Sequence, residues 1–352
     1  MLEELSTKST GRDWDTDPDG TVRMAVVGVG GFARRLALPA IDASDYCELT
    51  TLVTGAPDER TDVAAEYGAE TVVTYEAFQS GEVAGAYDAA YVVTPNRLHL
   101  PNAEAAAEQG KAVLCEKPLE ATLDRAERLV AACETAGVTL MTAYRMQVDP
   151  AVRRLREFLR SGGLGDVVKL HGDFTFPVLE GSYGPDHWRL DPHLAGGGAL
   201  YDVGVYPLNT SRFLLGTEPV AVEATTAGSG PFEGVDERVA FQVRFPDDVV
   251  GSFSASFTGH AHSTLSVLGT EGRVTLEDAF VPRRGRRLVV DRGTRTTLEG
   301  VGGDEVREEF DYFADRVLSG RPPEPDGEDG LRDMQVMDAV YDAAAAGERV
   351  RL

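Results

Sequence analysis

The chain has 352 residues, 42% of them apolar, and a formal charge of −24 at pH 7. Its length suggests two domains, and its negative charge argues against nucleic acid and anionic membranes as partners, because phosphate groups bind clustered Lys and Arg. No apolar stretch approaches the roughly 20 residues that span a bilayer. The polar N-terminus lacks the apolar segment of a secretory signal, so we expect a cytoplasmic protein.

The charged residues follow an unusual pattern. Lys and Arg together number 34, against 58 acidic residues spread over the whole chain, and the four lysines are Lys8, Lys111, Lys117 and Lys169. Such an acidic surface suits concentrated salt, where a Debye length of about 3 Å at 1 M suppresses self-repulsion. We therefore expect a halophilic protein, with an ordinary acidic protein as the alternative.

Short apolar runs and helical stretches alternate over the first part of the chain. This alternation predicts an α/β domain with a doubly wound parallel sheet over residues 22–145, after an N-terminal extension at 1–21. The expected strands are 24–29, 47–53, 71–75, 89–94, 111–116 and 139–144, and the expected helices are 32–43, 58–67, 100–109 and 123–136.

The second part of the chain has a different pattern. A charged helix after Pro150 leads into runs with the character of antiparallel strands. We therefore expect an α+β domain over residues 146–352 with a large, open, mostly antiparallel sheet and a last helix near 331–345. The expected strands are 167–176, 221–228, 239–245, 251–259, 263–269, 273–280 and 286–292.

The turn after the first strand predicts a dinucleotide, although a plain Gly-rich turn is the alternative. Its two leading glycines fit the strand-to-helix turn of a dinucleotide-binding fold, and a small Ala occupies the third fingerprint position. The pyrophosphate would bind free backbone N–H groups at the start of the next helix. The expected cofactor-binding residues here are Gly28, Gly30, Gly31, Phe32 and Ala33.

The end of the second strand indicates which nicotinamide nucleotide binds. NAD enzymes usually place a carboxylate there for the ribose 2′-hydroxyl, but this chain has Thr54 and no acid before Asp58. NADP is therefore favoured over NAD. Thr54 with Arg60, or Arg34 with Arg35, could bind the 2′-phosphate.

Polar residues follow two more strands of the predicted parallel sheet, where ligands bind in such folds. Thr94, Pro95 and Asn96 follow one strand and could pass under the nicotinamide. His99 opens the next helix, as a cofactor contact or as a surface or capping residue.

Glu116 and Lys117 follow the next strand. In a chain that uses Arg almost everywhere, a lysine here indicates a need for a compact ammonium group. It could hydrogen-bond a substrate hydroxyl; a surface Lys–Glu pair is the alternative.

A glycine-rich segment in the second domain carries two further candidates. After Gly196, Gly197 and Gly198, which allow close backbone approach, Asp202 and Tyr206 are four residues apart and would share one helix face. A carboxylate, a phenol and Lys117 would form an acid–base set for a sugar hydroxyl. A structural Asp–Tyr pair is the alternative.

Together these motifs, GVGGFA, TPNRLH, EKP and AGGGALYDVGVYPLN, cover most of the chain in this order. In them the chain resembles the glucose-fructose oxidoreductase and inositol dehydrogenase family. Segments such as KAVLCEKPLEAT and DHWRLDP are similar to the haloarchaeal D-xylose 1-dehydrogenases within it. The resemblance implies an enzyme that oxidises the C1 hydroxyl of a sugar to the aldonolactone, with D-xylose as the favoured sugar.

The resemblance also implies residue roles. Tyr206, its phenolate favoured by Lys117, would remove the proton of the anomeric hydroxyl while a hydride passes from C1 to the nicotinamide. Asp202 would hold a sugar hydroxyl. Tyr144 and Arg145 would border the pocket. Trp188 and Arg189 would close over nicotinamide or sugar, with Trp188 as a core residue the alternative.

Other functions stay open at this stage. They are a glucose-fructose oxidoreductase-like enzyme that retains its nucleotide, a dehydrogenase of inositol or another polyol, and a non-catalytic sugar or NADPH sensor. The six histidines offer no metal-ligand spacing, so we expect no metal. We expect a homo-oligomer, a dimer or tetramer, because an open sheet face needs burial.

Overall fold

The computed structural model describes residues 12–180 and 184–352, so the first eleven residues of the expected N-terminal extension lie outside it. The described residues form two compact units. We call residues 12–145 with 306–332 the parallel-sheet unit, and residues 146–305 with 333–352 the nine-stranded unit.

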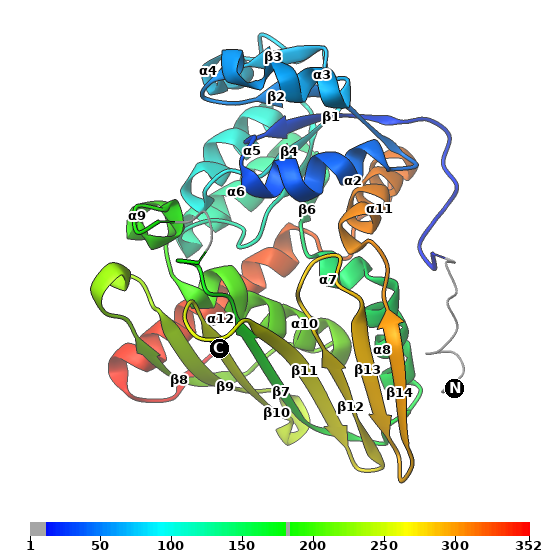
Figure 1. The fold of residues 1–352 in the computed structure, drawn as a ribbon, viewed down its shortest axis with the longest axis vertical. Helices are drawn as coiled ribbons and strands as arrows, with labels where there is room; N and C mark the ends of the chain where they lie inside the picture. The colour runs from blue at the N-terminus through cyan, green and yellow to red at the C-terminus, as the bar shows by residue number, and fades with distance from the viewer. Residues whose placement is uncertain (1–11, 181–183) are drawn as a thin grey trace. The chain divides into compact units, whose positions relative to one another are not determined.

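The parallel-sheet unit contains the predicted doubly wound sheet, with strand order β3-β2-β1-β4-β5-β6 and every pairing parallel. Helices flank it (Figure 1). Because helices cover such a sheet, its central strands are apolar throughout, and all four residues of β4 and of β5 are buried. Its strands are β1 Val22–Val27, β2 Cys47–Val53, β3 Thr71–Val73, β4 Ala89–Val92, β5 Ala112–Cys115 and β6 Leu140–Thr142.

The helices of this unit include two that our sequence analysis did not predict, α4 and α11. Helix α11 carries buried Val306, Phe310 and Phe313 at helical spacing, and Phe310 meets the ring of Tyr91 in β4 edge-on at 5.0 Å. Helix α11 thus clusters with this unit, although it follows most of the second domain in the sequence. The segments are η1 Ala33–Ala37, α2 Leu38–Asp42, η2 Pro57–Arg60, α3 Thr61–Tyr67, α4 Tyr75–Gln79, η3 Asn96–Leu98, α5 His99–Glu108, α6 Leu123–Ala136 and α11 Glu305–Ser319.

The nine-stranded unit holds the expected large sheet, in the order β14-β13-β12-β11-β7-β10-β9-β8-β15. Only β7 and β10 pair in parallel among its described strands; the other pairings are antiparallel, as predicted. Strands β14 and β15 are additions to the sequence prediction. The strands are β7 Val167–Thr175, β8 Ala221–Ala227, β9 Arg238–Arg244, β10 Val250–Ser256, β11 His262–Gly269, β12 Gly272–Glu277, β13 Arg286–Asp291, β14 Arg295–Val301 and β15 Val350–Arg351.

The strands of this sheet alternate between a buried face and a polar face. In β10, Phe253 and Ala255 are buried, whereas Ser252 and Ser254 are partly exposed. Helix α10 packs on β7 and β10, and α8 packs on α10. The helical segments are α7 Arg145–Val148, α8 Pro150–Arg160, η4 Trp188–Leu190, α9 Pro192–Ala195, η5 Leu200–Gly204, α10 Val205–Leu215, η6 Gly230–Phe232, η7 Pro246–Asp248 and α12 Gly327–Ala346.

Two smaller observations concern the whole chain. Within residues 12–180 and 184–352, no helix has both the length and the apolar character that crossing a membrane requires. The cysteines Cys47, Cys115 and Cys133 are free and buried.

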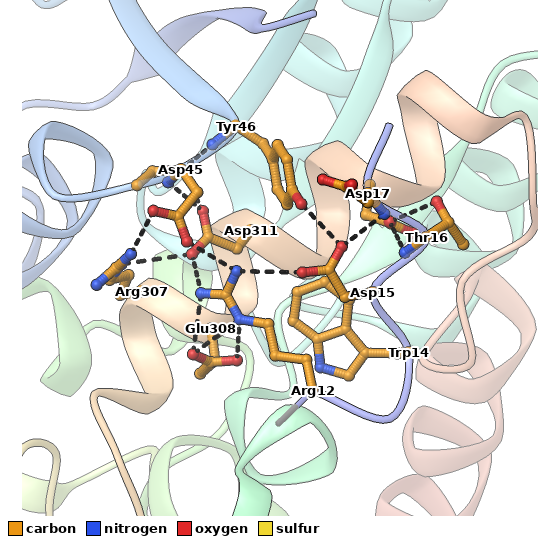
Figure 2. A network of polar contacts seen from close by, with 12 residues as sticks. Arg12, Trp14, Asp15, Thr16, Asp17, Asp45, Tyr46, Arg307, Glu308 and Asp311 are labelled. Atoms are coloured by element: carbon orange, nitrogen blue, oxygen red, sulfur yellow. Dashed lines mark hydrogen bonds and ion pairs between the residues drawn. The ribbon is translucent and has the colours of Figure 1, made fainter. Parts of the chain in front are cut away.

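A network of ion pairs joins Arg12, in the N-terminal extension, to helix α11 and to the turn before β2 (Figure 2). The guanidinium group of Arg12 donates to Glu308 and Asp311 of α11 and, at 2.9 Å, to Asp45 in the turn before β2. It also lies over the ring of Trp14, which is 6% exposed. One cation thus neutralises carboxylates from two distant parts of the sequence.

Removing this cation should destabilise the unit. We expect Arg12→Met to lower the free energy of unfolding by about 2 kcal/mol, because fully buried Asp311 loses a partner while Arg12 itself keeps some contact with water. Urea titration followed by circular dichroism would measure the loss. Arg23→Met, which removes a pair with Asp88 in which both side chains are about 40% exposed, is the control and should cost much less. Equal losses in the two variants would contradict this role of Arg12.

Candidate active site

The carboxyl ends of the parallel strands meet at one edge. The Gly28 N–H donates to Val53 O at 2.9 Å, Val93 N–H donates to Val27 O at 2.9 Å, and Glu116 N–H donates to Val92 O at 2.9 Å. The strand order reverses direction between β1 and β4. In open α/β sheets, ligands bind at such a switch point, outside the carboxyl ends.

In the glycine turn after β1, one glycine lies against the neighbouring backbone and another lies beside open space. Gly28 has φ +107°, and a Cβ there would be 2.9 Å from Val93 O, so only glycine fits. At Gly30 a Cβ would meet nothing within 4 Å. The backbone at Gly30 therefore borders open space where a ligand can approach closely.

The helix after this turn begins at Gly31, next to the expected Phe32. Its segment η1 is a π-helix, and Phe32 occupies the N-cap position of that segment. Ala33 is fully buried, which agrees with a small residue packing against the sheet. Arg34 and Arg35 are exposed, and the Arg35 guanidinium would be 3.4 Å from a Cβ on Gly31.

The segment after β4 is mostly buried. Thr94 and Asn96 are each 5% exposed, and within the described residues the Thr94 Oγ1 atom has no hydrogen-bond partner. Pro95 lies between them and is partly exposed. A buried hydroxyl without a partner at the switch point suits a polar ligand.

The structure gives His99 a role other than direct cofactor contact. Its ring is fully buried, and its two nitrogens lie 3.0 Å from Thr94 O and 3.2 Å from Leu119 O. Burial lowers the pKa of His99, against the opposing charge of Glu120. His99 thus links the segments after β4 and β5, and we revise its expected role from binding to positioning.

Glu116 and Lys117 follow β5. The Glu116 carboxylate accepts a hydrogen bond from Tyr91 Oη at 2.6 Å and one from the Lys117 N–H at 3.2 Å. The Lys117–Pro118 peptide bond is cis, and the Lys117 side chain is partly exposed. The Glu116 side chain is therefore held by the protein itself.

Tyr144 and Arg145 extend the same edge. Ala143 N–H donates to Cys115 O at 2.8 Å, which aligns the end of β6 with the end of β5. Tyr144 is 4% exposed and Arg145 is 3% exposed.

The residues expected at the 2′-phosphate sit after β2. Thr54 is 6% exposed, and its Oγ1 accepts a long hydrogen bond of 3.4 Å from Ala56 N–H. The Arg60 Nη1 atom donates to the carbonyl of Glu59 at 2.9 Å.

Within the nine-stranded unit, the structure singles out Asp202 and Tyr206. Between residues 200 and 214 these are the two side chains that are not buried. The Tyr206 ring contacts Phe174 and Phe280, with centroids 5.5 and 5.8 Å away. An otherwise buried helix therefore presents these two groups at its accessible surface.

The helix geometry between Asp202 and Tyr206 departs from the α-helix that we expected. Segment η5 is a π-helix, in which Val205 N–H donates to Leu200 O, and α10 follows it. Pro207 has no N–H to donate to the preceding turn. π-Helical turns inside α-helices often mark functional sites.

Arg189 and Asp202 form the clearest polar pair of the predicted substrate residues. The Arg189 Nε donates to Asp202 Oδ2 at 2.8 Å, and its guanidinium lies over the Trp188 ring at 4.6 Å. Trp188 is partly exposed, so the alternative of a core residue is wrong. Burial, then the charge of Arg189, lowers the pKa of His187 to about 4, so His187 is neutral near pH 7 and its Nδ1 accepts from Arg189 N–H.

Comparison with known proteins identifies the family. Residues 22–144 match the model "Oxidoreductase family, NAD-binding Rossmann fold", and residues 152–275 match the "GFO/IDH/MocA C-terminal domain". The chain is 48% identical to the D-xylose 1-dehydrogenase [NADP(+)] of Haloarcula marismortui, over 97% of this chain and 96% of that protein. It belongs to the GFO/IDH/MocA oxidoreductase family.

Other members of the GFO/IDH/MocA family are also similar. The D-xylose 1-dehydrogenase (NADP(+)) 2 of Haloferax volcanii is 33% identical over 93% of this chain and 98% of its own. The crystal structure of aldose-aldose oxidoreductase from Caulobacter crescentus, complexed with glycerol, has a TM-score of 0.89 and 32% identity. That match covers 94% of this chain and all of the other.

The parallel-sheet unit fits the dinucleotide that the family's Rossmann model implies. Gly30 leaves open space where a pyrophosphate needs backbone approach, and the helix that begins at Gly31 has first-turn N–H groups of the kind that bind anions. The Thr94 hydroxyl, which has no hydrogen-bond partner among residues 12–180 and 184–352, lies at the same edge.

Several residues near the candidate site residues of this GFO/IDH/MocA chain were not predicted from the sequence. Phe174 and Phe280 come from β7 and from the segment after β12, so their contact with Tyr206 depends on strand pairing. His187 precedes Trp188 within the DHWRLDP motif and could have been found there. Asp236 and Tyr341 had no signal in a single sequence.

The two glycines of the turn allow binding to be separated from folding. We expect Gly30→Leu to weaken NADP binding at least about tenfold with an unchanged Tm, because its side chain would fill only the space of the ligand. Gly28→Ala should instead lower the Tm, because its Cβ would clash with Val93 O. Fluorescence titration with NADPH and thermal unfolding would measure both. Normal NADPH binding by the Gly30 variant would contradict the proposed nucleotide position.

Proposed function

We propose that this protein is an NADP-dependent aldose 1-dehydrogenase that oxidises D-xylose to its aldonolactone. The observation that carries the proposal is the 48% identity, over 97% of the chain, to the Haloarcula D-xylose 1-dehydrogenase [NADP(+)]. The chemistry of Lys117, Asp202 and Tyr206 agrees with it, because a cation, a carboxylate and a phenol can bind a sugar and move a proton.

NADP supplies the hydride acceptor, and the side chains transfer the proton and bind the sugar. Tyr206 takes the proton of the anomeric hydroxyl as the C1–H bond breaks and C1 becomes a carbonyl carbon. The ammonium of Lys117 hydrogen-bonds the reacting oxygen. The products are the lactone, NADPH and a proton.

The remaining site residues bind and orient the sugar. Arg189 holds the Asp202 carboxylate at 2.8 Å in a defined direction, and Asp202 accepts a hydrogen bond from a sugar hydroxyl. The stacked Trp188–Arg189 pair gives the sugar or nicotinamide a flat, partly apolar neighbour. Tyr144 and Arg145 border the sugar.

Residues after β1, β2, β4 and β5 bind the nucleotide in this proposal. Thr54 replaces the carboxylate that would repel a 2′-phosphate, and exposed Arg34, with Arg60, supplies positive charge. The wider set comprises Gly28, Gly30, Gly31, Phe32, Ala33, Thr94, Pro95, Asn96, Glu116 and Lys117.

We also propose a role for each unit, an oligomeric state and a cellular environment for the enzyme. The parallel-sheet unit binds the nucleotide through residues 22–145, and the nine-stranded unit binds the sugar and forms a homo-oligomer, a dimer or tetramer, through its polar sheet face. The charge of −24 favours work in a cytoplasm of high salt concentration.

A second candidate is an aldose–aldose oxidoreductase that keeps its nucleotide bound and reduces one sugar with the hydride of another. The TM-score of 0.89 to the Caulobacter aldose-aldose oxidoreductase favours including it. Nucleotide that stays with the protein through desalting and turns over without added NADP would support this candidate over the dehydrogenase.

Substitution of the acid–base pair tests the proposed chemistry. We expect Lys117→Met and Tyr206→Phe each to lower turnover of D-xylose by about 10² or more, with NADP affinity within about twofold of normal. Lys111→Met is a matched control, because Lys111 stands before β5 and Lys117 after it. Steady-state rates of NADPH formation and NADPH titration would measure both effects. Near-normal turnover in both test variants would refute the assigned roles.

A further inference from the structure

Asp236, just before β9, makes an unusual set of contacts with the helix that carries Asp202 and Tyr206. Its carboxylate accepts hydrogen bonds from the N–H groups of Gly198, at 2.7 Å, and Leu200, at 2.8 Å. Its own carbonyl accepts the N–H of Ala199 at 2.9 Å. Three successive N–H groups at the start of the helix therefore bind one residue.

Tyr341 of α12 completes this cluster. Its hydroxyl donates to Asp236 Oδ1, and it also accepts a weaker hydrogen bond from Gly198 N–H at 3.4 Å. Asp236 is 6% exposed, and burial raises its pKa against the lowering effect of these hydrogen bonds. A carboxylate with several donors at a helix start is also favoured by the helix dipole.

The contacts explain two of the three glycines in the AGGG segment. A Cβ on Gly198 would lie 2.0 Å from Asp236 O, and a Cβ on Gly197 would lie 2.3 Å from Tyr341 Oη. We expected these glycines to allow close backbone approach, and the group that approaches is Asp236 with Tyr341. Larger residues at these two positions would prevent Asp236 and Tyr341 from contacting the start of the helix.

Asp236 is itself anchored in the sheet. The next residue, Glu237, donates its N–H to Ala227 O at 2.8 Å and accepts the N–H of Phe257 at 2.8 Å. Directly after Tyr206, Pro207 packs closely on Gly172 of β7, where an added Cβ would be 2.7 Å from the Pro207 ring. The helix thus contacts the rest of the unit both before Asp202 and directly after Tyr206.

We propose that Asp236 and Tyr341 are positioning residues for the sugar oxidation, which fix the π-helical turn that presents Asp202 and Tyr206. The inference rests on the proposed function, because it needs those two residues to act on the sugar. Leu200, whose N–H binds Asp236, is two residues before Asp202 and opens the π-turn that ends in the Val205-to-Leu200 hydrogen bond.

The test compares Asp236→Asn, the milder Tyr341→Phe and the surface control Asp247→Asn. We expect Asp236→Asn to lower kcat for D-xylose at least about tenfold per NADPH-binding site, because its amide turns one acceptor into a donor facing a backbone N–H. Tyr341→Phe should lower it about threefold. NADPH affinity should stay within about twofold of normal in both, and the control should match the unaltered protein.

The isotope effect on hydride transfer separates positioning from folding. With D-xylose deuterated at C1, we expect Asp236→Asn to raise the primary isotope effect on kcat, since a misplaced Tyr206 slows the chemical step. A fall in Tm and in the number of NADPH sites, with kcat per site and isotope effect unchanged, would overturn the inference while leaving the proposed function intact. An unaltered protein that oxidises no aldose would overturn both.

Discussion

The close approach of Gly28 to β4 is the constraint from which the nucleotide site follows. A Cβ at Gly28 would be 2.9 Å from Val93 O, so the turn after β1 can pass beside β4 only with a glycine. That passage brings the start of η1 and the segment at Thr94 to one edge of the sheet. Gly30, two residues later, is then left beside open space, and the same turn serves folding at one position and ligand binding at the other.

A second constraint acts in the nine-stranded unit. The helix of residues 200–214 is buried apart from Asp202 and Tyr206. Asp236 and Tyr341 hold its first turn, and Arg189 holds Asp202. Acid–base chemistry needs groups in fixed positions, because small displacements cost large factors in rate, and this helix is contacted before Asp202 and directly after Tyr206.

Much of the fold could be predicted from the sequence because its signals are local. The alternation of strands and helices predicted the parallel sheet, and strand β2 and helix α6 fall on the predicted residues. Helix α11 was missed, although Val306, Phe310 and Phe313 have helical spacing, because the window is rich in acids. Strands β14 and β15 were missed because they depend on pairing partners far away in the sequence.

Some residues of the candidate site could likewise be predicted from the sequence, and others could not. Motif residues such as Gly28 and Tyr206 could be found from their neighbours in sequence. The clamp by Asp236 and Tyr341 could not, since each lies more than 30 residues from Gly198 and neither belongs to a recognisable motif. The full burial of His99 was also invisible, because it depends on Leu119 of the next strand's loop.

The most direct test of the proposed aldose 1-dehydrogenase activity is the initial rate of nicotinamide reduction by the purified protein in about 2 M KCl. NADP and NAD would be supplied separately with D-xylose, D-glucose, L-arabinose, D-ribose and myo-inositol. We expect NADP-dependent oxidation that is fastest with D-xylose and yields its lactone. No reduction of NADP with any of the aldoses would contradict it.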